Sequence, residues 1–311
     1  MAKAWTVKDI PPQESRIAVV TGVGGLGFET ALALAGAGAV VVLAGRNPER
    51  GEEAVKRIRA RHSGADIAFQ GLNLASLASV AECAEQIAGR HDAVDLLINN
   101  AGVMAPPRRE TTADGFELQL GTNYLGHFAL TAHLLPLLRR ARGPRVVNVS
   151  SNAHRGGQIH FDDLQSERGY EPWTVYSQSK LAMLMFALEL QRRSDAAGWG
   201  LLSAAAHPGF ARTELIAKGP GERSMMARIA GPLMHLIGQS AAEGALPLLY
   251  AATAAQVVGG GYYGPSGLFE IAGPPKPANI SKQALDQRAA EQLWRTSEAL
   301  TGVSFDAAGK V

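Results

Sequence analysis

The stretch "RIAVVTGVGGLGFETALALAGAGA" (16–39) decides the fold. It begins with a short β-branched run, continues into the glycine-rich loop "TGVGGLG" (21–27), and ends in a segment of helical character. Gly22, Gly24 and Gly27 satisfy the spacing G-x-G-x-x-G. Such glycines allow a tight turn and a close approach of the backbone to a pyrophosphate, which the positive N-terminus of the next helix attracts. A strand, this loop and a helix in that order predict a dinucleotide-binding βα unit.

Short apolar runs recur along the rest of the chain and alternate with helical segments. Because these runs are apolar throughout rather than at every second position, they are typical of a parallel sheet that is covered on both sides. The pattern predicts an α/β fold: a single Rossmann-type, doubly wound parallel sheet with helices on both faces. The apolar runs are 40–45, 65–74, 94–99, 144–150, 201–207 and 267–273, and the helical segments include 111–140, about 174–197 and about 281–300.

The chain of 311 residues is expected to form one domain, 1–311, because no Ser/Pro linker or internal repeat divides it. The dinucleotide-binding core is expected at about 16–210. Residues 211–240 combine a Gly/Pro break with an apolar, Met-rich stretch, which favours a substrate lid over plain packing and over a membrane-touching patch. A C-terminal helix is expected at about 281–300.

Composition excludes several classes of protein. A net charge of +2 without a Lys/Arg block argues against a nucleic-acid-binding surface. Cys83 is the only cysteine, so an intrachain disulfide and a thiolate metal cluster are excluded, and its apolar-periodic surroundings favour a packed helix residue. No two of the eight histidines have the spacing of a helical metal site, so no metal is expected. With no stretch suited to a signal peptide or a bilayer span, a cytoplasmic protein is expected.

The end of the second strand, "LAGRN", bears on the choice of cofactor. NAD-binding folds usually have an acidic residue here for the ribose 2′-OH, whereas NADP needs a cation for its 2′-phosphate. Gly45 stands at the acidic position and Arg46 follows it. The missing carboxylate favours NADP(H), with NAD(H) as the alternative.

The stretch "YSQSK" (176–180) allows two kinds of chemistry. Tyr176 and Lys180 are four residues apart and Ser177 and Lys180 are three apart, and both spacings bring side chains together on a helix. The first pair fits a phenol acid held reactive by an ammonium group, and the second fits the S-x-x-K pattern of serine acyl-enzymes. No S-D-N, K-T-G or G-x-S-x-G motif accompanies Ser177, so the tyrosine pair is favoured.

Five motifs in order give the chain a family resemblance: "NNAG" (99–102), "TNYLGHF" (122–128), "VVNVSS" (146–151), "YSQSK" (176–180) and "HPGFART" (207–213). With them the chain resembles the short-chain dehydrogenase/reductase family. The long gap between the serine and tyrosine motifs, with "TG" (301–302) near the end, resembles the branch of retinol dehydrogenases and protochlorophyllide reductases.

The resemblance implies a set of site residues. The catalytic group would be Asn123, Ser151, Tyr176 and Lys180. Asn123 would hold a water that connects Lys180 to solvent, and Ser151 would bind the substrate oxygen. The cofactor would be held by Gly22, Gly25, Leu26, Gly27, Arg46, Asn73, Leu74, Asn99, Ala101, Gly102, Tyr176, Lys180, Pro208, Gly209 and Thr213.

Two departures from the family pattern stand out. The loop "TGVGGLG" is one residue shorter than the family's T-G-x-x-x-G-x-G, and Asn73 replaces the usual Asp after the third strand. The short loop puts the geometry around the phosphates in question, whereas the amide oxygen of Asn73 remains able to accept from adenine.

The combined reading predicts an NADP(H)-dependent oxidoreductase that interconverts a ketone or aldehyde and an alcohol on a lipophilic or aromatic substrate. A lysine charge about 4 Å from Tyr176 would contribute about 4 kcal/mol, the energy of a three-unit fall in the phenol pKa. The alternatives are a C=C reductase of the protochlorophyllide reductase type and a non-catalytic NADP-binding sensor. The apolar helix 181–190 is expected to pack on the sheet or on a partner subunit, and the resemblance implies a homodimer or homotetramer.

Overall fold

The computed structural model describes residues 4–211 and 238–305. Most of the expected lid, 211–240, and Thr213 therefore lie outside the described residues. At the two ends of this segment, Ala211 and Gln239 pair as an isolated parallel β-bridge, so the chain leaves and re-enters the described structure at one place.

The core is one eight-stranded sheet in the order β3-β2-β1-β4-β5-β6-β7-β8. All neighbouring strands are parallel except β7 and β8, which are antiparallel. The chain reverses its direction of travel across the sheet between β1 and β4, the place where such folds bind ligands at the carboxyl ends of the strands. The strands are β1 (Ile17–Thr21), β2 (Val40–Gly45), β3 (Ile67–Gly71), β4 (Leu96–Asn99), β5 (Arg145–Val149), β6 (Leu202–Ala206), β7 (Tyr262–Pro265) and β8 (Pro275–Pro277).

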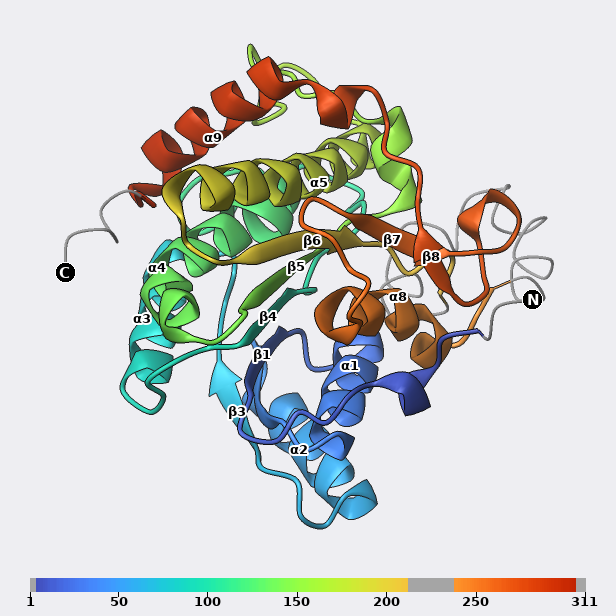
Figure 1. The fold of residues 1–311 in the computed structure, drawn as a ribbon. Helices are drawn as coiled ribbons and strands as arrows, with labels where there is room; N and C mark the ends of the chain where they lie inside the picture. Colours follow the sequence, from blue (N-terminus) through green and yellow to red (C-terminus); the bar gives the residue numbers. More distant parts are fainter. Residues whose placement is uncertain (1–3, 212–237, 306–311) are drawn as a thin grey trace.

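Helices cover both faces of the sheet (Figure 1). Successive strand residues point to opposite faces, so Val19 belongs to one apolar cluster and its neighbours Ala18 and Val20 to the other. The first cluster includes residues of α3, α4, α5 and α9, and the second includes residues of α1, α2 and α8. This arrangement confirms the predicted doubly wound fold. The helices are α1 (Gly25–Gly36), α2 (Pro48–Arg61), α3 (Leu77–Ala88), α4 (Gly126–Arg140), α5 (Pro172–Ala197), α8 (Ala241–Thr253) and α9 (Gln287–Thr301).

Three expected boundaries were wrong. The segment 111–140 is helical only from a π-helical turn, η2 (Leu120–Leu125), that leads into α4. The run 267–273 is no strand but contains the short 3₁₀ turn η5 (Leu268–Glu270), and the strand lies before it, in β7. The C-terminal helix α9 begins at Gln287 rather than near 281, because the side chain of Asp286 caps it by accepting from the N–H of Ala289.

The apolar helix 181–190 is covered within its own chain. Helix α9 packs on α5 through an aromatic cluster in which the Trp294 ring lies 5.1 Å from Phe128, 5.7 Å from Phe186 and 4.4 Å from Phe305, measured between centroids. Sheet and α9 together bury α5 almost completely over this stretch. The all-round apolar character of α5 therefore has an explanation that needs no partner subunit, and the homo-oligomer stays a prediction.

The α9–α5 contact predicts the effect of one substitution on stability. Replacing the fully buried Trp294 by Ala leaves a cavity among aromatic rings and should lower the free energy of unfolding by about 3–5 kcal/mol. Leu285→Ala is the control, because Leu285 is exposed and its loss should cost less than about 0.5 kcal/mol. Chemical denaturation measures both, and equal effects would contradict the packing described here.

Candidate active site

The glycine loop closes tightly between β1 and α1. Gly22 and Gly25 have left-handed backbones, with φ of 96° and 51°. A Cβ on Gly27 would lie 1.9 Å from the carbonyl oxygen of Gly22, so no side chain fits there. Gly24, by contrast, is extended at φ −130°, and a Cβ on it would meet only Arg50, at 3.9 Å. Contacts within the protein thus constrain Gly22, Gly25 and Gly27, the set that the family resemblance implies, and leave Gly24 unconstrained.

The loop is anchored to the chain segment after β4. The Thr21 hydroxyl oxygen accepts from the backbone N–H groups of Asn100 and Ala101, each at 2.9 Å, and the Asn100 amide donates to the Thr21 carbonyl at 2.7 Å. Ala101 and Gly102 thereby follow the glycine loop along one edge of the site. The side chain of Leu26, which belongs to this loop, lies against Gly244 of α8.

Two arginines lie near the end of β2. Arg46 is exposed directly after the strand, as expected. A Cβ on Gly45 would lie 2.6 Å from Cγ1 of Val23, so an acidic side chain at position 45 would require Val23 to move. Arg50, in the first turn of α2, brings a second guanidinium to within 3.9 Å of a Cβ position on Gly24. The sequence reasoning missed Arg50; its place one helical turn after Arg46 was the available signal.

The side chains of three residues expected along the adenosine side have contacts within the chain. The Asn73 amide oxygen accepts from the N–H of Ala75 at 3.2 Å. The side chain of Leu74 is buried in the core. Asn99 is also fully buried, and its amide donates to Thr131 at 3.0 Å and to Asn148 at 2.9 Å. Leu74 and Asn99 therefore contribute to the packing at this end of the sheet, and Asn73 shapes its own turn.

Asn123 lies in the π-helical turn η2, a distortion frequent at functional sites. Its side chain accepts from the N–H of Val103 at 2.8 Å and donates to the Val103 carbonyl at 3.0 Å. The backbone carbonyl of Asn123 accepts from Nδ1 of His127 at 2.8 Å. Because burial lowers the pKa of His127 to about 4, the imidazole is neutral, and its Nε2 accepts from the Thr21 hydroxyl at 2.9 Å. Asn123 is thus tied to the glycine loop through His127.

Ser151, Tyr176 and Lys180 come together at the carboxyl end of β5. Ser151 follows the strand, and Tyr176 and Lys180 lie one turn apart near the start of α5. The Tyr176 hydroxyl lies within hydrogen-bonding reach of the Ser151 side chain. The Lys180 ammonium donates to the carbonyl of Val149 at 3.0 Å and lies 5.8 Å from the centroid of the Tyr176 ring. A Cβ on Gly102 would be 3.7 Å from the Lys180 nitrogen, so the "NNAG" segment passes directly beside it.

The protonation of this pair differs from the expected one. Burial raises the pKa of Tyr176 to about 12, and the hydrogen bond to Ser151 opposes that rise. Burial also lowers the pKa of Lys180 to about 8. The expectation that Lys180 brings the pKa of Tyr176 towards neutrality is wrong for this structure, because desolvation of the phenol outweighs the other effects.

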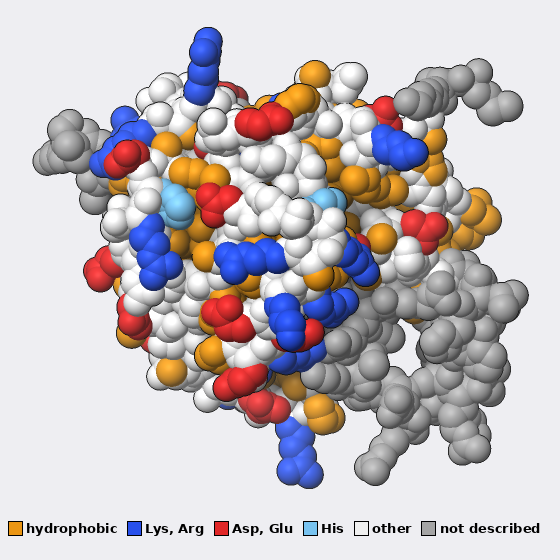
Figure 2. All heavy atoms as spheres, turned by 90° about the horizontal axis from the view of Figure 1, so that it is seen from below, with side chains coloured by type: hydrophobic (Ala, Val, Ile, Leu, Met, Phe, Trp, Pro, Cys, Tyr) orange, Lys and Arg blue, Asp and Glu red, His pale blue; other side chains and the backbone are white. Residues whose placement is uncertain are grey.

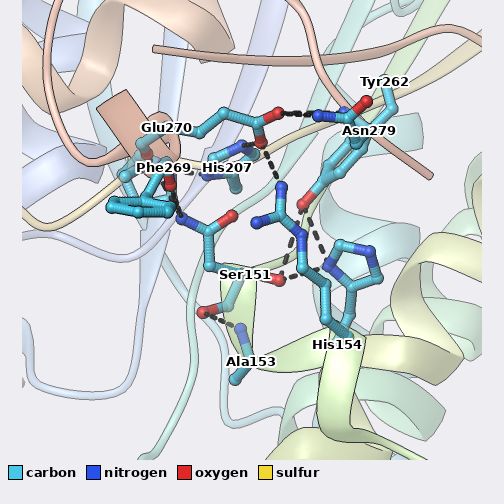
Figure 3. Close-up of polar contacts among 12 residues, drawn as sticks. Ser151, Ala153, His154, His207, Tyr262, Phe269, Glu270 and Asn279 are labelled. Atoms are coloured by element: carbon cyan, nitrogen blue, oxygen red, sulfur yellow. Dashed lines mark hydrogen bonds and ion pairs between the residues drawn. The ribbon is translucent and has the colours of Figure 1, made fainter. Parts of the chain in front are cut away.

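The segment "HPG" (207–209) lies at the end of β6. Gly209 is left-handed at φ 62°, and its N–H donates to Nδ1 of His207 at 3.2 Å. Figure 3 shows the other side of His207, where Nε2 is 3.0 Å from the Glu270 carboxylate. His154 is fully buried, and its Nδ1 is 2.7 Å from the Ser151 carbonyl. His154 therefore supports the serine backbone from within.

Residues 4–211 and 238–305 offer no metal site and no cysteine nucleophile. These residues include no cluster of three or more His, Cys, Asp and Glu side chains able to hold a metal ion. Burial raises the pKa of Cys83 to about 12, so it is a packed thiol and not a nucleophile. Nor does this part of the chain contain a helix both long and apolar enough to cross a bilayer. Figure 2 shows acidic and basic side chains intermingled on one face of the molecule.

Comparison with known proteins shows the family of the chain. The family model "short chain dehydrogenase" matches residues 16–222. The chain is 42% identical to polyprenol dehydrogenase of Mus musculus, covering 94% of this chain and 86% of that protein. It is 41% identical to retinol dehydrogenase 13 of Homo sapiens, covering 92% and 84%.

Solved structures share the fold. An uncharacterised protein from Mycobacterium paratuberculosis with a known crystal structure is 40% identical in sequence to this chain. Its structure matches with a TM-score of 0.80, covering 97% of this chain and 99% of that one. A protein of Escherichia coli CFT073 in complex with NADPH is 25% identical, with a TM-score of 0.55 over 73% and 92%. The chain is therefore a member of the short-chain dehydrogenase/reductase family, in the branch that includes the retinol dehydrogenases.

Proposed function

We propose that the protein is an NADP(H)-dependent oxidoreductase that interconverts a ketone or aldehyde and an alcohol on a lipophilic substrate. The observation that carries the proposal is the meeting of the Tyr176 hydroxyl, the Ser151 side chain and the buried Lys180 ammonium at one edge of the sheet. This edge also carries the glycine loop, so a dinucleotide bound there would place its reactive end beside the phenol.

The residues present fit such a cofactor. Gly22 and Gly27 admit no Cβ, because it would collide with Asn100 and, at Gly27, with the Gly22 carbonyl, so the loop makes the tight turn that a pyrophosphate site needs. Arg46 and Arg50 supply positive charge near the end of β2, and no carboxylate stands at position 45. Charge-assisted hydrogen bonds of this kind to a 2′-phosphate contribute about 1.5–3 kcal/mol each, which favours NADP(H) over NAD(H).

In the proposed mechanism the bound nicotinamide supplies the hydride. The Tyr176 phenol donates its proton to the substrate oxygen as negative charge develops there, and the Ser151 hydroxyl donates a hydrogen bond to the same oxygen. A pKa of about 12 suits Tyr176 as a proton donor that is fully protonated before the reaction. The Lys180 ammonium, with a pKa of about 8, stabilises the phenolate that forms. Because Lys180 donates to the Val149 carbonyl, the charge is held in place before substrate binds.

Several exposed side chains near these groups are apolar. Trp173 is half-exposed, and its ring meets that of Tyr176 edge-on at 5.9 Å between centroids. Leu268 and Phe269 are exposed on the loop between β7 and β8, and the Asn152 amide next to Ser151 donates to the Phe269 carbonyl at 3.4 Å. These surfaces, with the names of the polyprenol and retinol dehydrogenases it resembles, support a lipophilic alcohol or carbonyl substrate.

Two other functions have less support. Reduction of a C=C bond would use the same Tyr176 and nicotinamide edge, but the only cysteine, Cys83, is buried in α3 and does not lie beside them. A sensor that binds NADP without turnover would gain nothing from burying a lysine beside a tyrosine, since burial of an ammonium costs free energy.

The Tyr176→Phe variant tests the acid. It keeps the ring that packs in the site and removes only the proton donor, so kcat/KM for the best carbonyl substrate should fall about 10²–10⁴-fold. NADPH binding, measured by fluorescence titration, should remain. Ser177→Ala is the matched control, since it removes the serine of the S-x-x-K alternative and should leave the rate unchanged. Loss of activity in Ser177→Ala alone would reverse the assignment.

The Arg46→Ala variant tests the cofactor preference. Removal of one guanidinium should weaken NADPH binding about tenfold or more and leave NADH binding nearly unchanged. An additional Arg50→Ala change should weaken NADPH binding further if both cations face the phosphate. Dissociation constants for the two cofactors, measured on the same preparation, decide the matter, and an equal loss for NADPH and NADH would speak against a 2′-phosphate site.

A further inference from the structure

Glu270 is a buried acid that the proposed mechanism does not use. It lies on the loop between β7 and β8 and is 4% exposed, next to Phe269, which is 73% exposed. Phe269 and Glu270 are both left-handed, with φ of 52° and 57°. Two successive non-glycine residues in this conformation cost about 1–3 kcal/mol each, so contacts elsewhere must hold the loop in place.

Four N–H donors converge on the Glu270 carboxylate (Figure 3). One oxygen, Oε1, accepts from the backbone N–H of Asn279 at 3.1 Å and from its side-chain amide at 2.8 Å. The other, Oε2, accepts from Arg155 at 2.7 Å and from Nε2 of His207 at 3.0 Å. Only an ionised carboxylate accepts at both oxygens, so the site requires an acid at position 270 and no neutral amide replaces it.

His207 connects Glu270 to the backbone of the "HPG" turn. The N–H of Gly209 donates to Nδ1 of His207, which places the imidazole proton on Nε2, facing Glu270. The imidazole fits only because residue 264 of β7 is glycine: a Cβ there would lie 2.0 Å from Nε2 of His207. Glu270 therefore fixes both the orientation and the tautomer of His207, and through them the left-handed Gly209.

The backbone around Glu270 reaches the serine side of the site as well. The Glu270 carbonyl accepts from the side-chain amide of Asn152 at 3.2 Å, and Asn152 follows Ser151 directly. The next carbonyl, of Ile271, accepts from the N–H of Phe210 at 2.8 Å. One loop thus contacts the segment after β5, which carries Ser151, and the segment after β6, which carries Pro208 and Gly209.

We infer that Glu270 is a positioning residue for the reaction: through His207 it holds the Pro208–Gly209 turn against the nicotinamide end of the cofactor, in fixed register with Ser151. The inference rests on the proposed function, because the assignment of this turn to the nicotinamide belongs to that proposal. It adds a residue from the last third of the chain that acts on the cofactor without touching it.

The Glu270→Gln variant tests the inference. The amide –NH₂ would face two donors whichever way the side chain turns, so either the Asn279 pair or the Arg155–His207 pair loses its acceptor. We expect the dissociation constant for NADPH, titrated by fluorescence without substrate, to rise about tenfold. Amide hydrogen exchange at 207–211, measured on the protein without added cofactor, should become faster, and KM for NADPH should rise by more than kcat falls.

Glu189→Gln is the matched control. Glu189 is also buried, at 3% exposed, and its carboxylate is held by two arginines, Arg192 and Arg193. It lies in the second half of α5. Its variant should lower the melting temperature and leave NADPH binding and exchange at 207–211 unchanged. Equal weakening of NADPH binding in both variants would show general destabilisation and overturn the inference.

The remaining outcomes separate the two proposals. If the parent protein fails to bind NADPH, the proposed function falls. If the parent binds and Glu270→Gln binds equally well with unchanged exchange, the positioning role falls and the proposed function stands. Should Glu270→Gln not fold, Asn279→Ala removes a single donor and should raise the dissociation constant about two- to threefold in the same assay. An unchanged constant there also overturns the role.

Discussion

The burial of one ammonium group sets the conditions for the rest of the site. Lys180 is 4% exposed, and its nitrogen donates to the Val149 carbonyl at the end of β5. Removing a charge from water costs free energy, which here appears as a pKa lowered to about 8. The strand end and Gly102 lie close to this nitrogen. A buried charge at the carboxyl edge of a parallel sheet, beside a phenol and a hydroxyl, is unfavourable for folding and suited to reaction.

Two neutral imidazoles connect segments that are distant in the sequence. His127 donates to the Asn123 carbonyl and accepts from Thr21, which joins α4 to the glycine loop. His207 accepts from Gly209 and contacts Glu270, which joins the end of β6 to the loop before β8. Burial lowers the pKa of both, so each ring presents one donor and one acceptor near neutral pH. A lysine in either place would offer only donors, and an acid only acceptors, so neither could form both links.

The sequence predicted the parts of the site that depend on local spacing. The strands, the loop between β1 and α1, and the meeting of Tyr176 with Lys180 follow from short-range patterns. The features that it missed depend on the environment. The pKa of Tyr176 follows from burial that no spacing reveals, and the run 267–273 looked like a strand because its two left-handed residues carry no sequence signal. The all-round apolar α5 allowed two interpretations, and only the position of Trp294 shows that α9 covers this helix within its own chain. The start of α9 was placed too early because the capping role of Asp286 was not recognised.

One contact joins the short glycine loop to position 45, where the sequence has glycine in place of a carboxylate. Val23, within the loop, has its Cγ1 2.6 Å from where a Cβ of residue 45 would lie, so glycine at 45 and valine at 23 are matched to each other. A longer side chain at the end of β2 would push on the loop that approaches the phosphates. Positive charge at this edge comes instead from Arg46 and from Arg50 of α2, whose guanidinium lies near Gly24. The glycine at position 45 and the valine of the loop are therefore matched at one contact, and α2 supplies positive charge near the loop.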